Sequence, residues 1–224
     1  MPYKQLGERL LRRGLGFQDI DALFVTHEHS DHVGCARQIV AQEGIPVWMS
    51  RGTYSAMGSP DMGESIRFAV DGEIIAMQDF ELRPFTVAHD AKEPLQLTVT
   101  TGNKRFGLLT DLGHATPYVT EQLQNLDAMV LEFNHDEEML RASKYPSFLK
   151  QRIAGSYGHL SNVQAAHLLQ AISHKGLRHV VAAHLSEQNN HPELVQRVIE
   201  VAIDERSFVL TIANADSGFD WIDV

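Results

Sequence analysis

The stretch 26-THEHSDH-32 does most to decide how this sequence folds and what it does. It directly follows a short apolar run that predicts a buried strand. Imidazole nitrogens and carboxylate oxygens are the usual ligands of Zn, Mn and Fe in proteins. In an extended loop His27 and His29 point the same way, whereas Asp31 and His32 enter a helical turn and face a second point. The stretch therefore predicts ligands for two metal ions.

Three later residues are further candidate ligands, because each of them follows a predicted apolar strand. They are His89, Asp111 and His184. A single histidine or aspartate at the end of a strand is often only a cap or turn residue. The same placement three times over favours ligands that complete the metal centre.

The chain pattern predicts an α/β protein built as one domain, residues 1–224. Strands alternate with helices in the second half, an arrangement that places helices on the outside of a sheet. The expected helices are 3–13, 32–43, 117–126, 161–174 and 192–205, with Gly14 as the C-cap of the first. The expected strands are 20–26, 47–49, 66–70, 73–77, 82–88, 95–100, 106–110, 128–133, 179–183 and 208–212. Those between 66 and 110 are expected to be successive strands of one antiparallel or mixed sheet.

Composition narrows the class of protein. The 224 residues are 43% hydrophobic, and the net charge of −10 argues against a surface coated in positive charge for unspecific binding of nucleic acid. A local basic groove remains compatible with that charge. The single Cys35 excludes a disulfide within the chain. The N-terminal residues contain no signal peptide, and no apolar run is long enough for a membrane span. We therefore expect a cytoplasmic protein with no membrane partner.

The order H-x-H-x-D-H, then His, then Asp in a TDLG turn, then His, resembles the metallo-β-lactamase superfamily from residue 20 to about residue 190. This resemblance implies a four-layer αβ/βα sandwich and two divalent metal ions, with Zn the first expectation and Mn or Fe as alternatives. One ion would be held by His27, His29 and His89, the other by Asp31, His32 and His184, with Asp111 bridging them. A hydroxide shared by the two ions would be the nucleophile.

Two further motifs resemble those of ribonuclease Z. Glu132 ends a predicted strand in VLEFNHD, and His159 precedes a helix in GHLSNVQAA. By the resemblance, His159 would donate a proton to the leaving oxygen or hold a phosphate, and Glu132 would orient its imidazole. With Asp31, they are the expected catalytic residues. Ser161 and Asn162 would offer free backbone N–H groups to a phosphate. Taken alone, Ser161 is better explained as a plain N-cap, and Glu132 is about equally expected to be a solvated strand-end carboxylate.

A basic and aromatic segment lies between these two motifs. It contains Arg141, Lys144, Lys150 and Arg152 together with Tyr145, Phe148 and Tyr157. Arg141 and Lys144 are the expected contacts to substrate phosphates. An amphipathic surface helix would show the same pattern. The motifs together most resemble the YycJ-like branch of the superfamily, whose members are treated as exonucleases or phosphodiesterases.

Three functions are therefore expected, in decreasing order of support. The first is a metal-dependent phosphodiesterase or nuclease acting on DNA or RNA. The second is a hydrolase of a small ester, thioester or lactone, and the third is a metal-stabilised domain that binds a partner without turnover. The resemblance also implies an N-terminally truncated fold that lacks the family's first strands, about thirty residues by comparison with the family. A homo-oligomer is left open.

Overall fold

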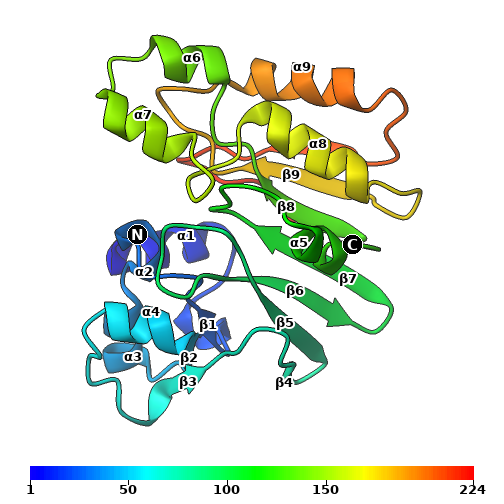
Figure 1. Ribbon diagram of the computed structural model, residues 1–224. Coiled ribbons are helices and arrows are strands. Elements are labelled where there is room, and N and C mark those ends of the chain that lie inside the picture. Colours follow the sequence, from blue (N-terminus) through cyan, green and yellow to red (C-terminus); the bar gives the residue numbers. More distant parts are fainter. The chain divides into compact units, whose positions relative to one another are not determined.

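The computed structural model describes all residues, 1–224, and divides into two units. Unit 1 comprises Met1–Glu73 and Ala91–Leu95, and unit 2 comprises Ile74–Asp90 and Gln96–Val224. Figure 1 labels the helices and strands of both. No helix combines the length and the apolar composition that crossing a membrane requires.

Unit 1 contains a three-stranded parallel sheet in the order β1-β2-β3. Its strands are β1 (Leu23–Phe24), β2 (Val47–Met49) and β3 (Ile66–Phe68), and its helices are α1 (Tyr3–Arg12), α2 (Ser30–Val33), α3 (Ala36–Glu43) and α4 (Arg51–Ala56). Val25, Val47 and Met49 form its small core with residues of α3 and the loop before β3. Gly14 follows the end of α1 with a φ of 74°, as expected for a glycine beyond a C-cap.

The predicted helix 32–43 is interrupted, and Gly34 is the reason. Its φ is 41°, and a Cβ at this position would lie 2.7 Å from the backbone nitrogen of Met1. Glycine tolerates both constraints, so α2 ends at Val33 and α3 starts two residues after Gly34. The short helix α2 carries the last three residues of the histidine stretch, Ser30, Asp31 and His32.

Unit 2 contains a seven-stranded sheet in the order β10-β9-β8-β7-β6-β5-β4. Its strands are β4 (Ile75–Met77), β5 (Phe80–Thr86), β6 (Leu95–Thr101), β7 (Lys104–Leu109), β8 (Ala128–Glu132), β9 (His179–Ala183) and β10 (Val209–Ile212). Strands β7 to β10 are parallel to one another, whereas β4 with β5 and β6 with β7 are antiparallel. The parallel strands all end at the same edge, where the polar site residues follow.

Three helices cover one face of this sheet: α5 (Pro117–Gln122), α8 (Asn162–Ile172) and α9 (Pro192–Ala202). Alternate strand residues such as Met129, Leu131 and Val180 face them and are fully buried. Helices α8 and α9 run side by side over β9 (Figure 1). Two shorter helices, α6 (Glu137–Ala142) and α7 (Ser147–Ile153), form the segment between β8 and α8.

One expectation about the first half of the chain was wrong, and one helix was not predicted. Strand β3 does not precede β4 in one sheet; it pairs with β2 in the parallel sheet of unit 1. Helix α4 was also missed, because the segment is too short for a clear helical period. A local signal was present, since Ser50 is its N-cap and accepts a hydrogen bond from the Thr53 N–H.

Candidate metal centre

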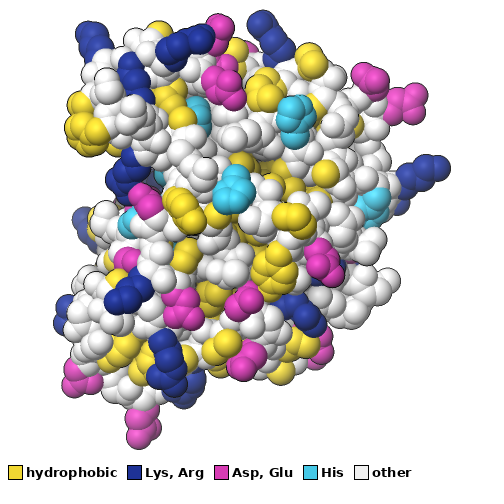
Figure 2. Space-filling view, in the orientation of Figure 1, with side chains coloured by type: hydrophobic (Ala, Val, Ile, Leu, Met, Phe, Trp, Pro, Cys, Tyr) yellow, Lys and Arg dark blue, Asp and Glu magenta, His cyan; other side chains and the backbone are white.

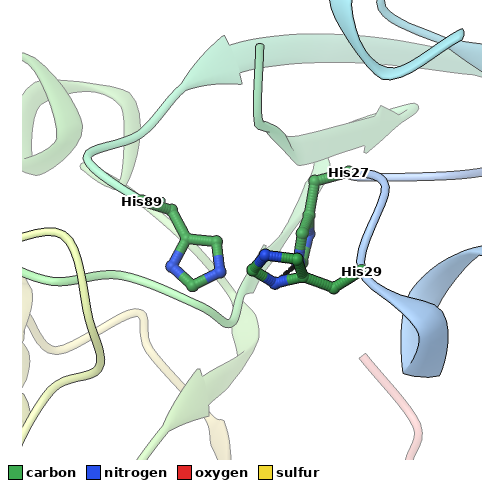
Figure 3. A group of neighbouring side chains, drawn as sticks. All are labelled: His27, His29 and His89. Carbon is green, nitrogen blue, oxygen red and sulfur yellow. Dashed lines mark hydrogen bonds between the residues drawn. The ribbon is translucent and has the colours of Figure 1, made fainter. Parts of the chain in front are cut away.

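The histidine stretch of unit 1 forms the loop between β1 and α2. His27 is fully buried, and its Nε2 lies 3.0 Å from Nδ1 of His29. Figure 3 shows these two rings turned toward each other from the same loop. The His27 and His32 ring centroids are 4.1 Å apart. Three imidazoles therefore gather at close range in this stretch and offer nitrogen donors for a metal ion.

Thr26 organises this loop, a role that the sequence analysis did not anticipate. Its Oγ1 lies 3.1 Å from Nδ1 of His27 and 3.2 Å from Nδ1 of His32. A contact at Nδ1 fixes the orientation of an imidazole and leaves Nε2 as the nitrogen for a ligand. Asp31 is more exposed, with its Oδ2 3.4 Å from Nε2 of His32.

In unit 2, His89, Asp111 and His184 follow strands β5, β7 and β9 respectively. Oδ1 of Asp111 lies 3.8 Å from Nε2 of His89 and 3.7 Å from Nε2 of His184. Figure 3 includes His89 on the loop that follows β5. The structure therefore brings together the three strand-end candidates that the sequence singled out.

Asp111 and His184 share an uncommon backbone conformation. Their φ angles are 57° and 58°, in the left-handed region that non-glycine residues seldom adopt. Such conformations cost about 1–3 kcal/mol each and tend to occur at functional sites. At the ends of β7 and β9, the left-handed turn directs both side chains toward the same point.

Glu132 and His159 form a hydrogen-bonded pair beside Asp111. Oε1 of Glu132 lies 2.8 Å from Nδ1 of His159, and its Oε2 accepts a hydrogen bond of 3.0 Å from the Leu112 N–H. Glu132 is fully buried, so the alternative of a solvated strand-end carboxylate was wrong. His159 also lies 3.7 Å from Oδ1 of Asp111.

The pKa values of this pair move in opposite directions. Burial favours the neutral form of each, but the mutual hydrogen bond and charge attraction outweigh it. The pKa of Glu132 is thereby lowered, with His184 contributing, and the pKa of His159 is raised. A carboxylate that stays ionised beside an imidazole that holds its proton suits a proton donor.

His89 is also oriented through its Nδ1. Its Nδ1 lies 3.1 Å from the carbonyl oxygen of Gly158, and a carbonyl there requires that Nδ1 carry the proton. Nε2 then carries the lone pair that a metal ligand needs. Burial lowers the pKa of His89, which favours the neutral imidazole that metal binding needs.

The loop before His159 is held tightly against the His89 loop. The Asp90 N–H donates to the Tyr157 carbonyl at 2.9 Å, and Arg152 Nε lies 2.6 Å from Oδ2 of Asp90. A Cβ on Gly113 would lie 2.2 Å from the Ser156 carbonyl oxygen, and one on Gly158 would lie 2.2 Å from that of Ile153. Only glycine permits these backbone approaches, which sequence patterns did not reveal.

The residues present fit divalent metal ions. Asp111, His159 and His184 each offer a ligand atom within 4.8 Å of the others. Imidazole and carboxylate donors without thiolate match Zn, Mn or Fe. His159 appears in this group as well as in the pair with Glu132, so its geometry also permits a ligand role that the sequence analysis did not consider.

The expectation that the start of α8 offers free N–H groups to a phosphate was wrong. The Ser161 N–H donates to Oε1 of Gln164, and the Asn162 N–H donates to the His135 carbonyl. Both side chains are about 1% exposed, with Ser161 in a capping box and Asn162 bonded to Asn190. The N-cap alternative for Ser161 is thereby confirmed.

The other two predicted substrate contacts lie in the segment between β8 and α8. Arg141 is in the last turn of α6, and Lys144 follows that helix; both are exposed. Asp136 is the N-cap of α6 and accepts hydrogen bonds from the Glu138 and Met139 N–H groups. The basic and aromatic segment thus folds within unit 2 as two short helices, α6 and α7.

Comparison with known proteins identifies the family of this chain. A family model described as the β-lactamase superfamily domain matches residues 4–185. Exodeoxyribonuclease YycJ of Bacillus anthracis is 32% identical over 198 residues, which cover 87% of this chain and 75% of that protein. Exodeoxyribonuclease WalJ of Streptococcus pneumoniae is 33% identical over 207 residues, covering 90% of this chain and 73% of the relative.

Solved structures support the same fold. The metallo-β-lactamase fold protein YhfI from Bacillus subtilis superposes with a TM-score of 0.69 at 14% identity, covering 92% of this chain and 78% of that one. A diphosphatase of the PhnP family superposes with a TM-score of 0.65 at 18% identity, covering 95% and 74%. The chain therefore belongs to the β-lactamase superfamily, and it is a metal-dependent hydrolase with the metallo-β-lactamase fold.

Proposed function

We propose that this hydrolase is a two-metal phosphodiesterase that acts on nucleic acid, with DNA as its preferred substrate. The observation that carries this proposal is the pair of the fully buried Glu132 and the partly buried His159 beside Asp111. A phosphodiester releases a basic alkoxide, which needs a proton, whereas many activated acyl substrates do not. The pair supplies a proton donor at the position where such a leaving group requires one.

The proposed ligand sets follow the order of the motifs in the family resemblance. His27, His29 and His89 would hold one ion and Asp31, His32 and His184 would hold the other, with Asp111 available to both. When bound, two divalent ions supply Lewis acidity and lower the pKa of water toward neutrality. The chain's part is to hold these donors in place, with Thr26 and the Gly158 carbonyl fixing the imidazole orientations.

In this proposal His159 moves the proton. Its Nδ1–H donates to Glu132, which leaves Nε2 as the nitrogen that gives a proton to the leaving oxygen. Glu132 stabilises the protonated ring, because a buried ionised carboxylate raises the pKa of an adjacent imidazole. Asp31 would contribute to the same reaction as a metal ligand.

The relatives support nucleic acid as the substrate. The two described above are named exodeoxyribonucleases, and each aligns with most of this chain. Removal of nucleotides from the end of a DNA strand is therefore the proposed reaction. Hydrolysis of a small ester, thioester or lactone by the same donors is the second candidate, and binding without turnover is the third.

One experiment separates these candidates. Purified protein, loaded with Zn or Mn, is given end-labelled single- and double-stranded DNA, RNA of the same sequence, and a chromogenic acyl ester. Release of nucleotides from DNA that is abolished by a chelator and by Asp111→Ala supports the proposal. Turnover of the ester alone supports the second candidate, and turnover of nothing supports the third. Activity undiminished in Asp111→Ala indicates a contaminating nuclease and removes the support.

A further inference from the structure

A cavity in unit 2 lies outside the donor cluster. It has a volume of about 450 Å³ and is bounded by α6, α7 and the start of α8. Cavities that hold small ligands commonly measure about 300–1,000 Å³. The residues that line it and enter the argument are His135, Leu140, Arg141, Lys150, Ala154 and Gln164.

Two cations, Arg141 and Lys150, line this cavity. Lys150 Nζ donates to the Arg141 carbonyl oxygen at 2.6 Å, which holds the ammonium in place and leaves two of its N–H donors. The Arg141 guanidinium meets Glu138 at 3.3 Å, but both side chains are more than three-quarters exposed. Such an exposed ion pair is weak, so the guanidinium can exchange it for a phosphate. Figure 2 shows basic side chains beside hydrophobic ones over α6 and α7.

The inner wall holds a buried polar atom without a partner. His135 is 2% exposed, and its Nδ1 makes no hydrogen bond within the chain. A buried polar group left unsatisfied costs about 1–3 kcal/mol. A ligand with a polar atom in this cavity would satisfy that nitrogen, so the histidine is a second observation that points to an occupant.

The remaining walls favour a nucleotide over a bare anion. Leu140 and Ala154 provide apolar surface, while the amide of Gln164 provides polar contacts. Glu137 also lines the cavity, and its Oε1 accepts a hydrogen bond from the Ser161 hydroxyl. Inorganic phosphate would bind weakly here, because the negatively charged carboxylate of Glu137 repels it. A nucleotide can place its phosphate beside Arg141 and Lys150. The hydrogen-bond donors of its base or sugar can then lie near Glu137.

The cavity shares two chain segments with the donor cluster. His135 and Ser161 are paired in a parallel bridge, and the Asn162 N–H donates to the His135 carbonyl at 2.8 Å. His159 lies two residues before Ser161, and Glu132 lies three residues before His135. A ligand in the cavity is thus held by the same two segments that position the proposed proton donor.

We propose that this cavity binds the terminal nucleotide of a DNA strand, with its phosphate between Arg141 and Lys150 and its base against Leu140 and Ala154. The proposal rests on the proposed function, since it takes the substrate to be nucleic acid. It assigns to the α6–α7 segment the recognition of a strand end, which an enzyme that removes terminal nucleotides requires.

Binding of small probes tests the cavity directly. Deoxyadenosine monophosphate, deoxyadenosine and inorganic phosphate are titrated into the metal-loaded protein by calorimetry. The monophosphate is expected to bind more tightly than the other two. The double variant R141Q/K150Q should weaken it by at least about tenfold, because charge-assisted hydrogen bonds are lost. Ala154→Trp fills the cavity from an exposed position and should weaken it without removing a charge.

The matched control is the double variant R197Q/K175Q, which removes the same charges from exposed positions elsewhere in unit 2. It should bind the monophosphate as the wild type does. Equal binding of inorganic phosphate and monophosphate would overturn the nucleotide assignment. Undiminished binding in R141Q/K150Q and Ala154→Trp would overturn the cavity itself. Failure of the proposed function would be seen in a different experiment, the DNA hydrolysis assay. In that case the wild type would release no nucleotides from DNA, whatever the titrations show.

Discussion

Nδ1 of His159 lies 2.8 Å from Oε1 of Glu132, a carboxylate that is fully buried and also accepts a hydrogen bond from the Leu112 N–H. A buried carboxylate with two hydrogen bonds is fixed in position and stays ionised. It therefore determines both the direction and the protonation of the imidazole. The first two predictions follow from this relationship.

His159→Ala should slow hydrolysis by a factor that depends on how basic the leaving group is. A positioned general acid contributes roughly 10²–10⁴-fold when the leaving group needs a proton. We expect a loss in this range with DNA, whose leaving alkoxide is basic, and a much smaller loss with bis-p-nitrophenyl phosphate. The measurement is kcat for both substrates with wild type and variant. An equal loss for both would assign His159 to metal binding instead of proton transfer.

Glu132→Gln should shift the pH profile of activity. Glu132 raises the pKa of His159, and a proton donor is active only while protonated. Activity of the wild type therefore declines as the pH rises through that raised pKa. Without the carboxylate charge the His159 pKa falls, so the alkaline decline should move to lower pH. Glu121→Gln, at an exposed position on α5, is the control and should leave the profile unchanged.

Gly113→Ala and Gly158→Ala should each destabilise the protein and reduce activity. The new methyl group would lie 2.2 Å from a backbone carbonyl oxygen in both cases, and the loop before His159 must then move. Overpacking of this kind costs about 1–3 kcal/mol. Denaturant unfolding gives the free energy. Gly7→Ala, in the interior of α1, is the control and should preserve stability, because its Cβ meets only a phenyl ring at 3.3 Å.

Asp127 should contribute to stability in a pH-dependent way. Its Oδ2 accepts from the Arg105 N–H at 2.9 Å, and its Oδ1 lies 3.3 Å from Lys104 Nζ, which ties β8 to β7. The backbone hydrogen bond is the main cause of its lowered pKa. Asp127→Ala should cost about 1–3 kcal/mol at neutral pH.

The sign of the pH effect follows from that lowered pKa. The contribution of Asp127 is complete above the unfolded pKa of about 3.9 and is lost as the pH falls through the lower folded pKa. The stabilities of wild type and Asp127→Ala should therefore converge in acid. Asp204→Ala, at an exposed position, is the control. A difference that stays constant across this pH range would contradict the assignment.

The strand ends were predictable from the sequence because apolar runs that stop at a polar residue mark the edge of a sheet. This placed His89, Asp111 and His184 correctly after β5, β7 and β9. The Ser161 capping box was visible for a similar reason, since its side-chain and backbone partners are only three residues apart. Local patterns of this kind can be interpreted without knowing which distant residues they contact.

Features that depend on distant partners were not predictable. Nothing in the run VLEF shows that Glu132 is buried against the Leu112 N–H, or that the backbone of Gly113 touches Ser156. The position of β3 beside β2 likewise results from long-range pairing that a strand pattern does not specify. The free N–H groups expected at α8 are occupied by partners, one of them from a segment 27 residues earlier.

The central claim is that the imidazoles and aspartates hold two metal ions that are needed for hydrolysis. Its most direct test is elemental analysis of purified protein together with DNA hydrolysis, for the wild type and Asp111→Asn. Asparagine tolerates the left-handed backbone at this position, so the variant removes the charge without adding strain. We predict about two ions per wild-type chain, fewer in the variant, and at least about a hundredfold loss of its activity. Full metal content and full activity in Asp111→Asn would contradict the claim.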